Sequence, residues 1–352
     1  MDNDKYKFDH SQEECYAALD KAEKNGTPLL ADELLYLGVA LLNGEYGLKT
    51  DTDRGHDLVR RAADASHPLA CLQIARSGLG EKELPGDTKK YLLTGAAAGE
   101  VECMTFLAML KNVGLIDDPA EVSYIESKLN EAAWRLYPEA LALRALEIAH
   151  LDSRTPEQVM DMRLYAALAL INGGSEMLDE NLELFFNQSD CKADGTIRLD
   201  KVVKESSDSG NPLAQWDRFL HLVTNQDGTI RATLTEGQRK LLKAAVAGHV
   251  PDAMEHVALE AVSEKRFSDA IELLRQPVEM KMPEPMLSQG MLMIMGDGTE
   301  KNVPEGLTYV EKSLEFGLPL SCMTFADLVD DGVVDDPYGC RADFYRYNAL
   351  NE

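Results

Sequence analysis

Residues Arg60–Cys71 read RRAADASHPLAC, and this pattern returns along the chain. Each copy holds a pair of small or apolar residues, a turn about four residues later, and a proline or its substitute before a small residue. Four further copies are LTGAAAGEVECM (Leu93–Met104), LNEAAWRLYPEA (Leu129–Ala140), LLKAAVAGHVPDA (Leu241–Ala253) and VEKSLEFGLPLSC (Val310–Cys322). Recurrence of this kind indicates an array of structural repeats.

The proline position marks the period of the repeat. The marker positions are Pro28, Pro68, Val101, Pro138, Ser175, Pro212, Pro251, Pro283 and Pro319. Successive markers lie about 36 residues apart, a spacing within the range of repeats built from two helices. Ser175 is the weakest marker and rests mainly on its spacing and on the two glycines before it.

Each unit is predicted to be a pair of helices. One apolar stripe falls on a single helical face: Leu58, Val59, Ala62 and Ala63. We expect Asp53 to cap this helix and Pro68 to be the first residue of the next one. A backbone N–H in the first helical turn has no partner within the helix, so proline, which lacks this group, loses no hydrogen bond there. The sequence has no alternating runs rich in valine and isoleucine, so the prediction is an all-α fold.

A leucine–glycine pair, a glycine-rich loop and paired alanines occur together in several units. One copy carries Leu37-Gly38, Gly44, Gly47, Asp51 and Ala62-Ala63. Others carry Gly78, Gly80, Ala96-Ala97 and Gly99, or Gly290, Gly296, Gly298, Gly306 and Gly317. With these features the chain resembles the Sel-one-like repeat family, a relative of the tetratricopeptide repeat. The resemblance implies a right-handed α-solenoid of about eight to nine stacked antiparallel helix pairs that binds proteins or peptides on its concave face. It implies no shared catalytic residues.

We expect residues 1–352 to form a single α-solenoid domain. Residues 150–210 depart from the repeat pattern, so they are predicted to be degenerate repeats or an insertion within it.

The net charge of the chain excludes some kinds of binding partner. The 352 residues include 61 acidic and 35 basic side chains, for a net charge of −26. A nucleic-acid backbone needs a basic surface, and an anionic membrane repels this charge, so we expect neither as a partner. The longest uncharged apolar run, Leu164–Ile171, is far shorter than the roughly 20 residues of a membrane-spanning helix. The first residues lack an apolar signal region, so we expect a cytoplasmic location.

No motif in the sequence calls for a metal, a cofactor or catalysis. The six cysteines are scattered without a CxxC pair, so neither a disulfide framework nor a zinc site is suggested, and Cys71, Cys103 and Cys322 are predicted to be small core residues. The segment from Asp190 has lysines, Lys192 and Lys201, where a calcium loop needs oxygen ligands, so we predict a turn leading into a helix. Asp118 and Asp336 are each followed by proline and are predicted to cap helices.

Three aromatic residues are candidates for contact with a partner: Tyr36, Trp134 and Trp216. Trp216 follows Pro212 in a predicted first helix, where the family resemblance places side chains near the concave wall. The methionines of Met280–Met295 could line an adaptable groove, but core packing is the favoured interpretation.

The sequence therefore predicts a protein-binding scaffold or inhibitor with no enzymatic activity. Its acidic surface would attract a protein with a basic patch. One form of this hypothesis is an immunity protein that neutralises a basic toxin such as a nuclease. An adaptor in a bacterial signalling or secretion pathway is an alternative, and so is an enzyme with its active site in the degenerate region 175–235.

Overall fold

The computed structural model describes residues 8–79, 86–173, 176–179, 182–225, 229–231 and 233–351. These residues are α-helical apart from turns, one short 3-10 helix and two isolated β-bridges, which confirms the all-α prediction. The chain forms two compact units. Unit 1 comprises residues 1–103 and 278–352, and unit 2 comprises residues 104–277. The expectation that residues 1–352 form a single α-solenoid domain stays a prediction.

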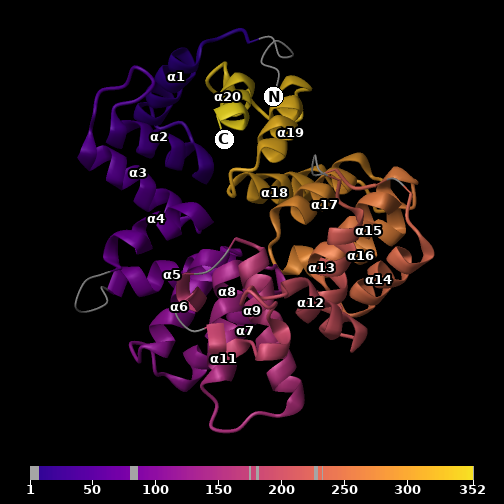
Figure 1. The fold of residues 1–352 in the computed structure, drawn as a ribbon. Coiled ribbons are helices and arrows are strands. Elements are labelled where there is room, and N and C mark those ends of the chain that lie inside the picture. The colour runs from indigo at the N-terminus through magenta and orange to yellow at the C-terminus, as the bar shows by residue number, and fades with distance from the viewer. Residues whose placement is uncertain are drawn as a thin grey trace. The chain divides into compact units, whose positions relative to one another are not determined.

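Unit 1 contains the first and last helices of the chain (Figure 1). They are α1 (Gln12–Lys24), α2 (Ala31–Asn43), α3 (Thr52–Asp64), α4 (Pro68–Gly78), α5 (Gly86–Ala98), α17 (Pro283–Met295), α18 (Val303–Leu314), α19 (Pro319–Asp330) and α20 (Arg341–Asn351). Helices that follow one another pack as pairs, and the contacts are most extensive between α2 and α3 and between α17 and α18.

Unit 2 contains most of α6 (Val101–Asn112) and most of α16 (Phe267–Glu279), which cross the boundary between the units. Between them lie α7 (Pro119–Trp134), α8 (Pro138–Ala149), α9 (Pro156–Ile171), α10 (Glu176–Asp179), α11 (Leu182–Phe185), η2 (Gln188–Asp190), α12 (Leu199–Asp208), α13 (Pro212–Val223), α14 (Glu236–Ala247) and α15 (Pro251–Ser263). The departure of residues 150–210 from the repeat pattern coincides with the short elements α10, α11 and η2.

The same left-handed backbone position precedes every marker. The residue two positions before the marker has a positive φ in each repeat: Gly26, Ser66, Gly99, Leu136, Gly173, Gly210, His249, Lys281 and Gly317. Most markers are themselves the first residue of a helix. Pro28 differs, because α2 begins three residues later at Ala31, and Ser175 lies outside the described residues, as does Gly80.

The paired small residues of the repeat supply the acceptors that close this turn. After α3, the backbone N–H of Ser66 donates to the carbonyl of Ala63 at 2.9 Å, and that of His67 donates to Ala62 at 3.1 Å. After α7, Leu136 and Tyr137 make the same two bonds to the next alanine pair. Two bonds of this kind around a left-handed residue satisfy carbonyls that a helix end leaves free. The recurring sequence pattern is therefore a recurring helix stop.

Two of the predicted helix caps need correction. The cap of α3 is Asp51, whose side chain accepts a hydrogen bond from the backbone N–H of Arg54, and Asp53 lies inside the helix. Asp336 does not cap a helix that begins at Pro337. Its carboxylate instead accepts from backbone groups of the turn before α20, at Tyr338 and Gly339.

The cap at Asp118 is confirmed, because its side chain accepts from the backbone N–H of Ala120 at the start of α7. The methionine segment packs mainly inward, as predicted. Met286 and Met293 are buried, whereas Met295 is 60% exposed.

The eighth residue of the first helix in each pair is buried where helices meet. This position is occupied by Gly38, Ala75, Ala108, Ala145, Phe219, Ala258, Gly290 and Ala326. Seven of these eight residues are glycine or alanine, and Phe219 of α13 is the exception. Small side chains let two helix backbones approach closely.

In two helix pairs both facing residues are glycine. A Cβ on Gly290 of α17 would lie 2.7 Å from the carbonyl oxygen of Gly306, and a Cβ on Gly306 of α18 would lie 2.7 Å from that of Gly290. Gly38 of α2 and Gly55 of α3 face each other in the same way. No side chain fits between these backbones without moving them apart.

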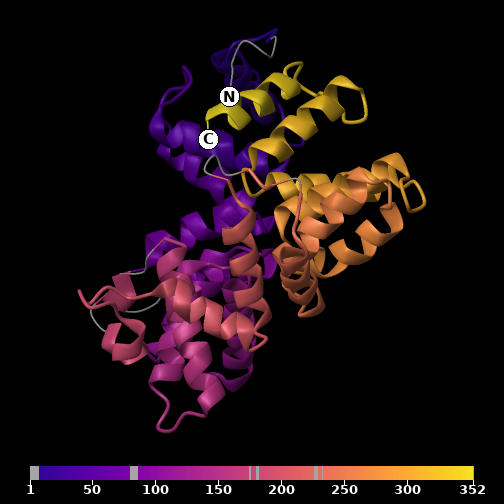
Figure 2. The same ribbon diagram turned by 45° about the vertical axis from the view of Figure 1, so that its right-hand side comes forward.

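The first and last described helices pack against each other within unit 1, where the indigo helices α1 and α2 lie beside the yellow helix α20 (Figures 1 and 2). Glu33 of α2 is fully buried and accepts hydrogen bonds from Arg341 Nε at 2.7 Å and Nη2 at 2.9 Å. The Tyr338 hydroxyl donates to the same carboxylate at 2.8 Å. A buried carboxylate with these partners is satisfied, and removing one partner would leave a buried charge unpaired.

Candidate functional site

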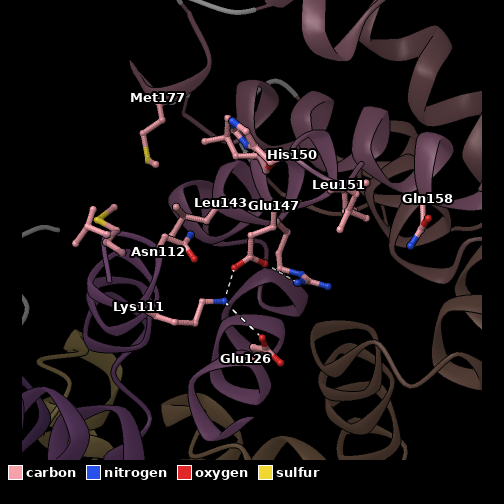
Figure 3. A pocket seen from close by; sticks show the side chains of 14 residues that line it. Lys111, Asn112, Glu126, Leu143, Glu147, His150, Leu151, Gln158 and Met177 are labelled. Carbon is pink, nitrogen blue, oxygen red and sulfur yellow. Dashed lines mark hydrogen bonds and ion pairs between the residues drawn. The ribbon is translucent and has the colours of Figure 1, made fainter. Parts of the chain in front are cut away.

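The candidate site is a groove in unit 2 with a volume of about 790 Å³. The last turn of α6, the middle of α7 and the second half of α8 form most of it. Its lining includes Lys111, Glu126, Leu143, Glu147, His150, Leu151 and Met177 (Figure 3). Helices of two consecutive repeats therefore build one concave surface.

An ion-pair network crosses the groove. Figure 3 shows the Lys111 side chain extended between two glutamates. Lys111 Nζ lies 2.7 Å from Glu147 Oε1 and 3.7 Å from Glu126 Oε1. Arg144 Nη1 lies 2.6 Å from the other oxygen of Glu147. Two cations and two carboxylates thus balance one another, and the charges of this network are matched within the groove.

Apolar side chains next to this network remain open to solvent. Val113, just beyond the end of α6, is 71% exposed, and Leu151, just beyond the end of α8, is 42% exposed. Leu143 closes the groove from α8 and is buried. Apolar surface beside a few fixed polar groups is the usual composition of a site that binds a side chain of another molecule.

Sequence reasoning did not find this site, although the chain carries a signal for it. Lys111 and Glu147 are 36 residues apart, which is one period of the repeat. Residues one period apart lie at matching positions of neighbouring repeats, so opposite charges at that spacing can pair. A search for such pairs would have located the ion-pair network.

A second groove of about 760 Å³ lies in unit 1. Leu93 and Thr94 of α5 line one side, and Thr308 and Tyr309 of α18 line the other, with Lys281 at its edge. The helices of this groove come from opposite ends of the sequence, so no local pattern predicts it.

The three predicted partner contacts lie in different places. Tyr36 is half-buried on α2, where its ring meets Phe344 edge-on at 5.9 Å between centroids. Trp134 is half-buried at the last residue of α7. Trp216 belongs to the core of unit 2 and is only 4% exposed. The structure does not bring the three together with the groove lining, and their role in partner binding stays a prediction.

The surroundings of Trp216 are aromatic. Its ring stacks on Phe219 at 5.5 Å, and both rings lie within 6 Å of the His256 ring of α15. Burial lowers the pKa of His256 below its ordinary value, which favours the neutral ring in this cluster. A direct contact between Trp216 and a partner would require this core to open.

In the loop considered for calcium binding, the first acidic residue is Asp190, which forms ion pairs with neighbouring segments. Asp190 is fully buried, and one carboxylate oxygen lies 2.5 Å from Arg163 Nη2 and 3.4 Å from Lys201 Nζ. Burial alone would raise the pKa of Asp190, but hydrogen bonds from the Asn187 backbone and from Arg163 hold it below its ordinary value. The residues that follow form the predicted turn into α12, closed by a bridge between Cys191 and Ile197.

Region 175–235, the alternative location for an active site, contains side chains that pair with one another in its described part. Asp208 lies 2.8 Å from Lys204 and 2.7 Å from Arg218, beside an open groove of about 670 Å³ that α12 to α14 line. Arg163 reaches from α9 to Glu205 at 3.1 Å. These ion pairs join α9, α12 and α13, and an active site in this region stays an untested alternative. Asp227, in the second loop of the region, lies outside the described residues.

Comparisons with known proteins returned structural neighbours. No family model matches the chain, and no curated protein matches it. Among solved structures, a Sel1 repeat protein from Oxalobacter formigenes is 18% identical over 93% of this chain and 97% of its own, with a TM-score of 0.35. A protective antigen present in uropathogenic Escherichia coli strains, displaying an SLR fold, is 14% identical over 96% of this chain and 90% of its own, with a TM-score of 0.40. At these identities the likeness concerns the fold.

Proposed function

We propose that this chain is a non-catalytic scaffold that binds another protein, and that the groove between α6, α7 and α8 is one of its contact sites. The observation that supports the proposal most is the exposed apolar edge at Val113 and Leu151 beside charges that are already paired. An apolar side chain of a partner gains most of its binding energy by leaving water, and Val113 and Leu151 offer it a surface.

The partner is proposed to carry a basic patch, because the net charge of −26 favours association with positive surfaces. Long-range attraction would raise the association rate, and the apolar contact in the groove would set the lifetime of the complex. Affinity should therefore fall as salt rises, mainly through slower association. Equal affinity at low and physiological ionic strength would contradict this part of the proposal.

A matched pair of variants tests the groove. The full chain is used to capture proteins from its native host, and the protein that salt elutes is purified. Val113→Asp should weaken binding of that protein about tenfold or more, because it places a charge on the apolar edge. Leu320→Asp is the control, since Leu320 of α19 in unit 1 is 63% exposed and receives the same change. Equal losses of affinity in both variants, or none in either, would reject the groove as the site.

The finer form of the proposal is an immunity protein that neutralises a basic toxin. If it is correct, the purified partner should have a toxic activity, such as nuclease activity, that one equivalent of this chain abolishes. A partner that keeps its activity in the complex would favour the alternative, an adaptor in a bacterial signalling or secretion pathway.

A cytoplasmic location belongs to the same proposal, and cell fractionation tests it. Among the described helices, none combines the length and the apolar character needed to span a bilayer.

A further inference from the structure

The two carboxylates in the groove between α6, α7 and α8 are not equally engaged. Glu147 of α8 has two cations at short distance, Lys111 Nζ at 2.7 Å and Arg144 Nη1 at 2.6 Å. Glu126 of α7 has one contact within the described part of the chain, at 3.7 Å from Lys111 Nζ, and this distance is too long for a hydrogen bond. Its side chain is 53% exposed. The charges of the network balance in number, but Glu126 is the member that stays open to solvent.

The cations of the network are less accessible than Glu126. The side chains of Lys111 and Arg144 are 13% and 25% exposed. A carboxylate of a partner would compete with Glu147 for them, and Glu147 is itself largely buried, so its displacement would leave a buried charge without its partners. A cation of a partner meets Glu126 while both short contacts of Glu147 stay in place. The groove is therefore complementary to a positive group.

The neutral side chains of the groove suit the rest of a basic residue. Asn112 directly follows Lys111, lines the groove and is exposed, and its amide oxygen can accept a hydrogen bond from an ammonium or guanidinium group. Val113 and Leu151, the exposed apolar edge, line the same groove. The methylene stem of a lysine or arginine covers apolar surface of this kind while its charged end stays at a polar group.

We propose, resting on the contact role proposed for this groove, that the residue it receives from the partner is a lysine or arginine with apolar neighbours. The charged end pairs with Glu126, which Figure 3 shows beyond the end of the Lys111 side chain. The stem and the apolar neighbours lie against Val113 and Leu151. The net charge of −26 attracts basic proteins in general, whereas Glu126 decides which side chain enters this groove.

A set of fluorescein-labelled peptides tests this inference with the full-length protein. The peptides share a flexible background of serine and glycine and differ at the centre, which is Leu-Lys-Leu, Leu-Gln-Leu, Leu-Glu-Leu or Ser-Lys-Ser. Fluorescence anisotropy at low ionic strength measures their affinities. Leu-Lys-Leu is expected to bind about threefold more tightly than Leu-Gln-Leu, because its lysine gains a partly exposed ion pair. Ser-Lys-Ser should bind more weakly than Leu-Lys-Leu, because it lacks the apolar contact.

Variants of one carboxylate at a time assign the preference for lysine. Glu126→Gln should remove the difference between Leu-Lys-Leu and Leu-Gln-Leu, and Glu126→Lys should make Leu-Glu-Leu the tighter peptide. Glu236→Gln in α14 is the matched control, because Glu236 is an exposed carboxylate of unit 2 outside the groove and its loss changes the net charge by the same amount. This control should keep the preference for lysine.

The inference is overturned if Glu126→Gln and Glu236→Gln reduce the preference equally, because net charge alone would then attract the lysine. It is also overturned if the natural sequence prefers Leu-Glu-Leu, or if none of the peptides binds.

Val113→Ser separates this failure from a failure of the groove itself. If Val113→Ser weakens Leu-Lys-Leu and Leu-Gln-Leu alike while Glu126→Gln changes neither, the groove stays a contact site and the pairing with Glu126 is wrong. If the peptides bind and Val113→Ser changes none of their affinities, the contact role of the groove is contradicted as well.

Discussion

The helix pair α17–α18 in unit 1 and the helix pair α13–α14 in unit 2 are each preceded by the same type of turn. The two pairs differ in the residue at which their first helix crosses the second. Each first helix begins at a proline that follows a left-handed residue by two positions, Lys281 in one pair and Gly210 in the other. At the eighth helical position α17 has Gly290, whereas α13 has Phe219. The turn is therefore common to both pairs, and the residue at the crossing is what differs.

This difference shows which part of the repeat is fixed by geometry. The turn recurs because the helix end must satisfy its last carbonyls before the chain can reverse. The crossing residue depends on its neighbours, since Gly290 faces the backbone of Gly306 while Phe219 fills space beside Trp216 and His256. A large residue at this position is compatible with the repeat where the facing helix leaves room for it.

The largest effect is expected at Phe219. Phe219→Ala gives α13 the alanine found in most other repeats, but here it leaves a cavity between Trp216 and His256. It should lower the free energy of unfolding by about 3–5 kcal/mol, measured by urea denaturation. Leu222→Ala on the same helix is the control, because Leu222 is 42% exposed and its loss should cost less than about 1 kcal/mol. If Phe219→Ala lowers the free energy of unfolding no more than Leu222→Ala does, the proposed difference between the two helix pairs is wrong.

In α17, adding a side chain at the eighth helical position is expected to destabilise the protein. Gly290→Ala places a Cβ 2.7 Å from the carbonyl of Gly306 and should destabilise the protein by about 1–3 kcal/mol. Gly237→Ala in α14 is the matched control, because no atom lies within 4 Å of its new Cβ and alanine favours helix. The control should be neutral or slightly stabilising. If both variants gain stability, the close approach of α17 and α18 is wrong.

The shared turn can be tested through the glycine at Gly210. Its φ of 97° is unfavourable for any side chain, and no atom lies within 4 Å of a Cβ added there. Gly210→Ala should therefore cost about 1–2 kcal/mol through backbone strain alone. Thermal denaturation measures it, and an unchanged midpoint would show that this turn does not need a left-handed residue.

The smallest effect is expected from replacing the left-handed Lys281 by glycine in the turn before α17. Lys281 is exposed and has a φ of 58°, so Lys281→Gly should relieve strain and raise the unfolding free energy by about 0.5–1 kcal/mol. The same denaturation experiment checks this gain. A loss of stability would mean that the Lys281 side chain contributes more by its packing near Gly99 than the left-handed backbone costs.

The repeat pattern was predictable from the sequence because it is local. The paired small residues, the left-handed position and the proline lie within a few residues, so one turn of backbone explains all three. The stripe of Leu58, Val59, Ala62 and Ala63 is buried as predicted. The cap of α3 was misplaced by two residues, because both Asp51 and Asp53 are chemically able to cap and only the backbone distinguishes them.

The features that sequence reasoning missed depend on distant residues. Glu33 and Arg341 are 308 residues apart in the sequence, and no spacing rule connects them. Trp216 was a candidate partner contact because of its helix position, and the structure shows it buried beside Phe219, so its role in partner binding stays a prediction. Burial of an aromatic residue depends on what packs over it, which a single repeat does not reveal.

The central claim is that α17 and α18 meet backbone to backbone at Gly290 and Gly306. A double-mutant cycle on Gly290→Ala and Gly306→Ala, measured by urea denaturation, tests it most directly. Each new Cβ would press on the carbonyl of the other glycine, so the first substitution should already separate the helices. The double variant is then expected to lose clearly less stability than the sum of the single losses. Losses that add within about 0.3 kcal/mol would show that the two sites are independent and would contradict the claim.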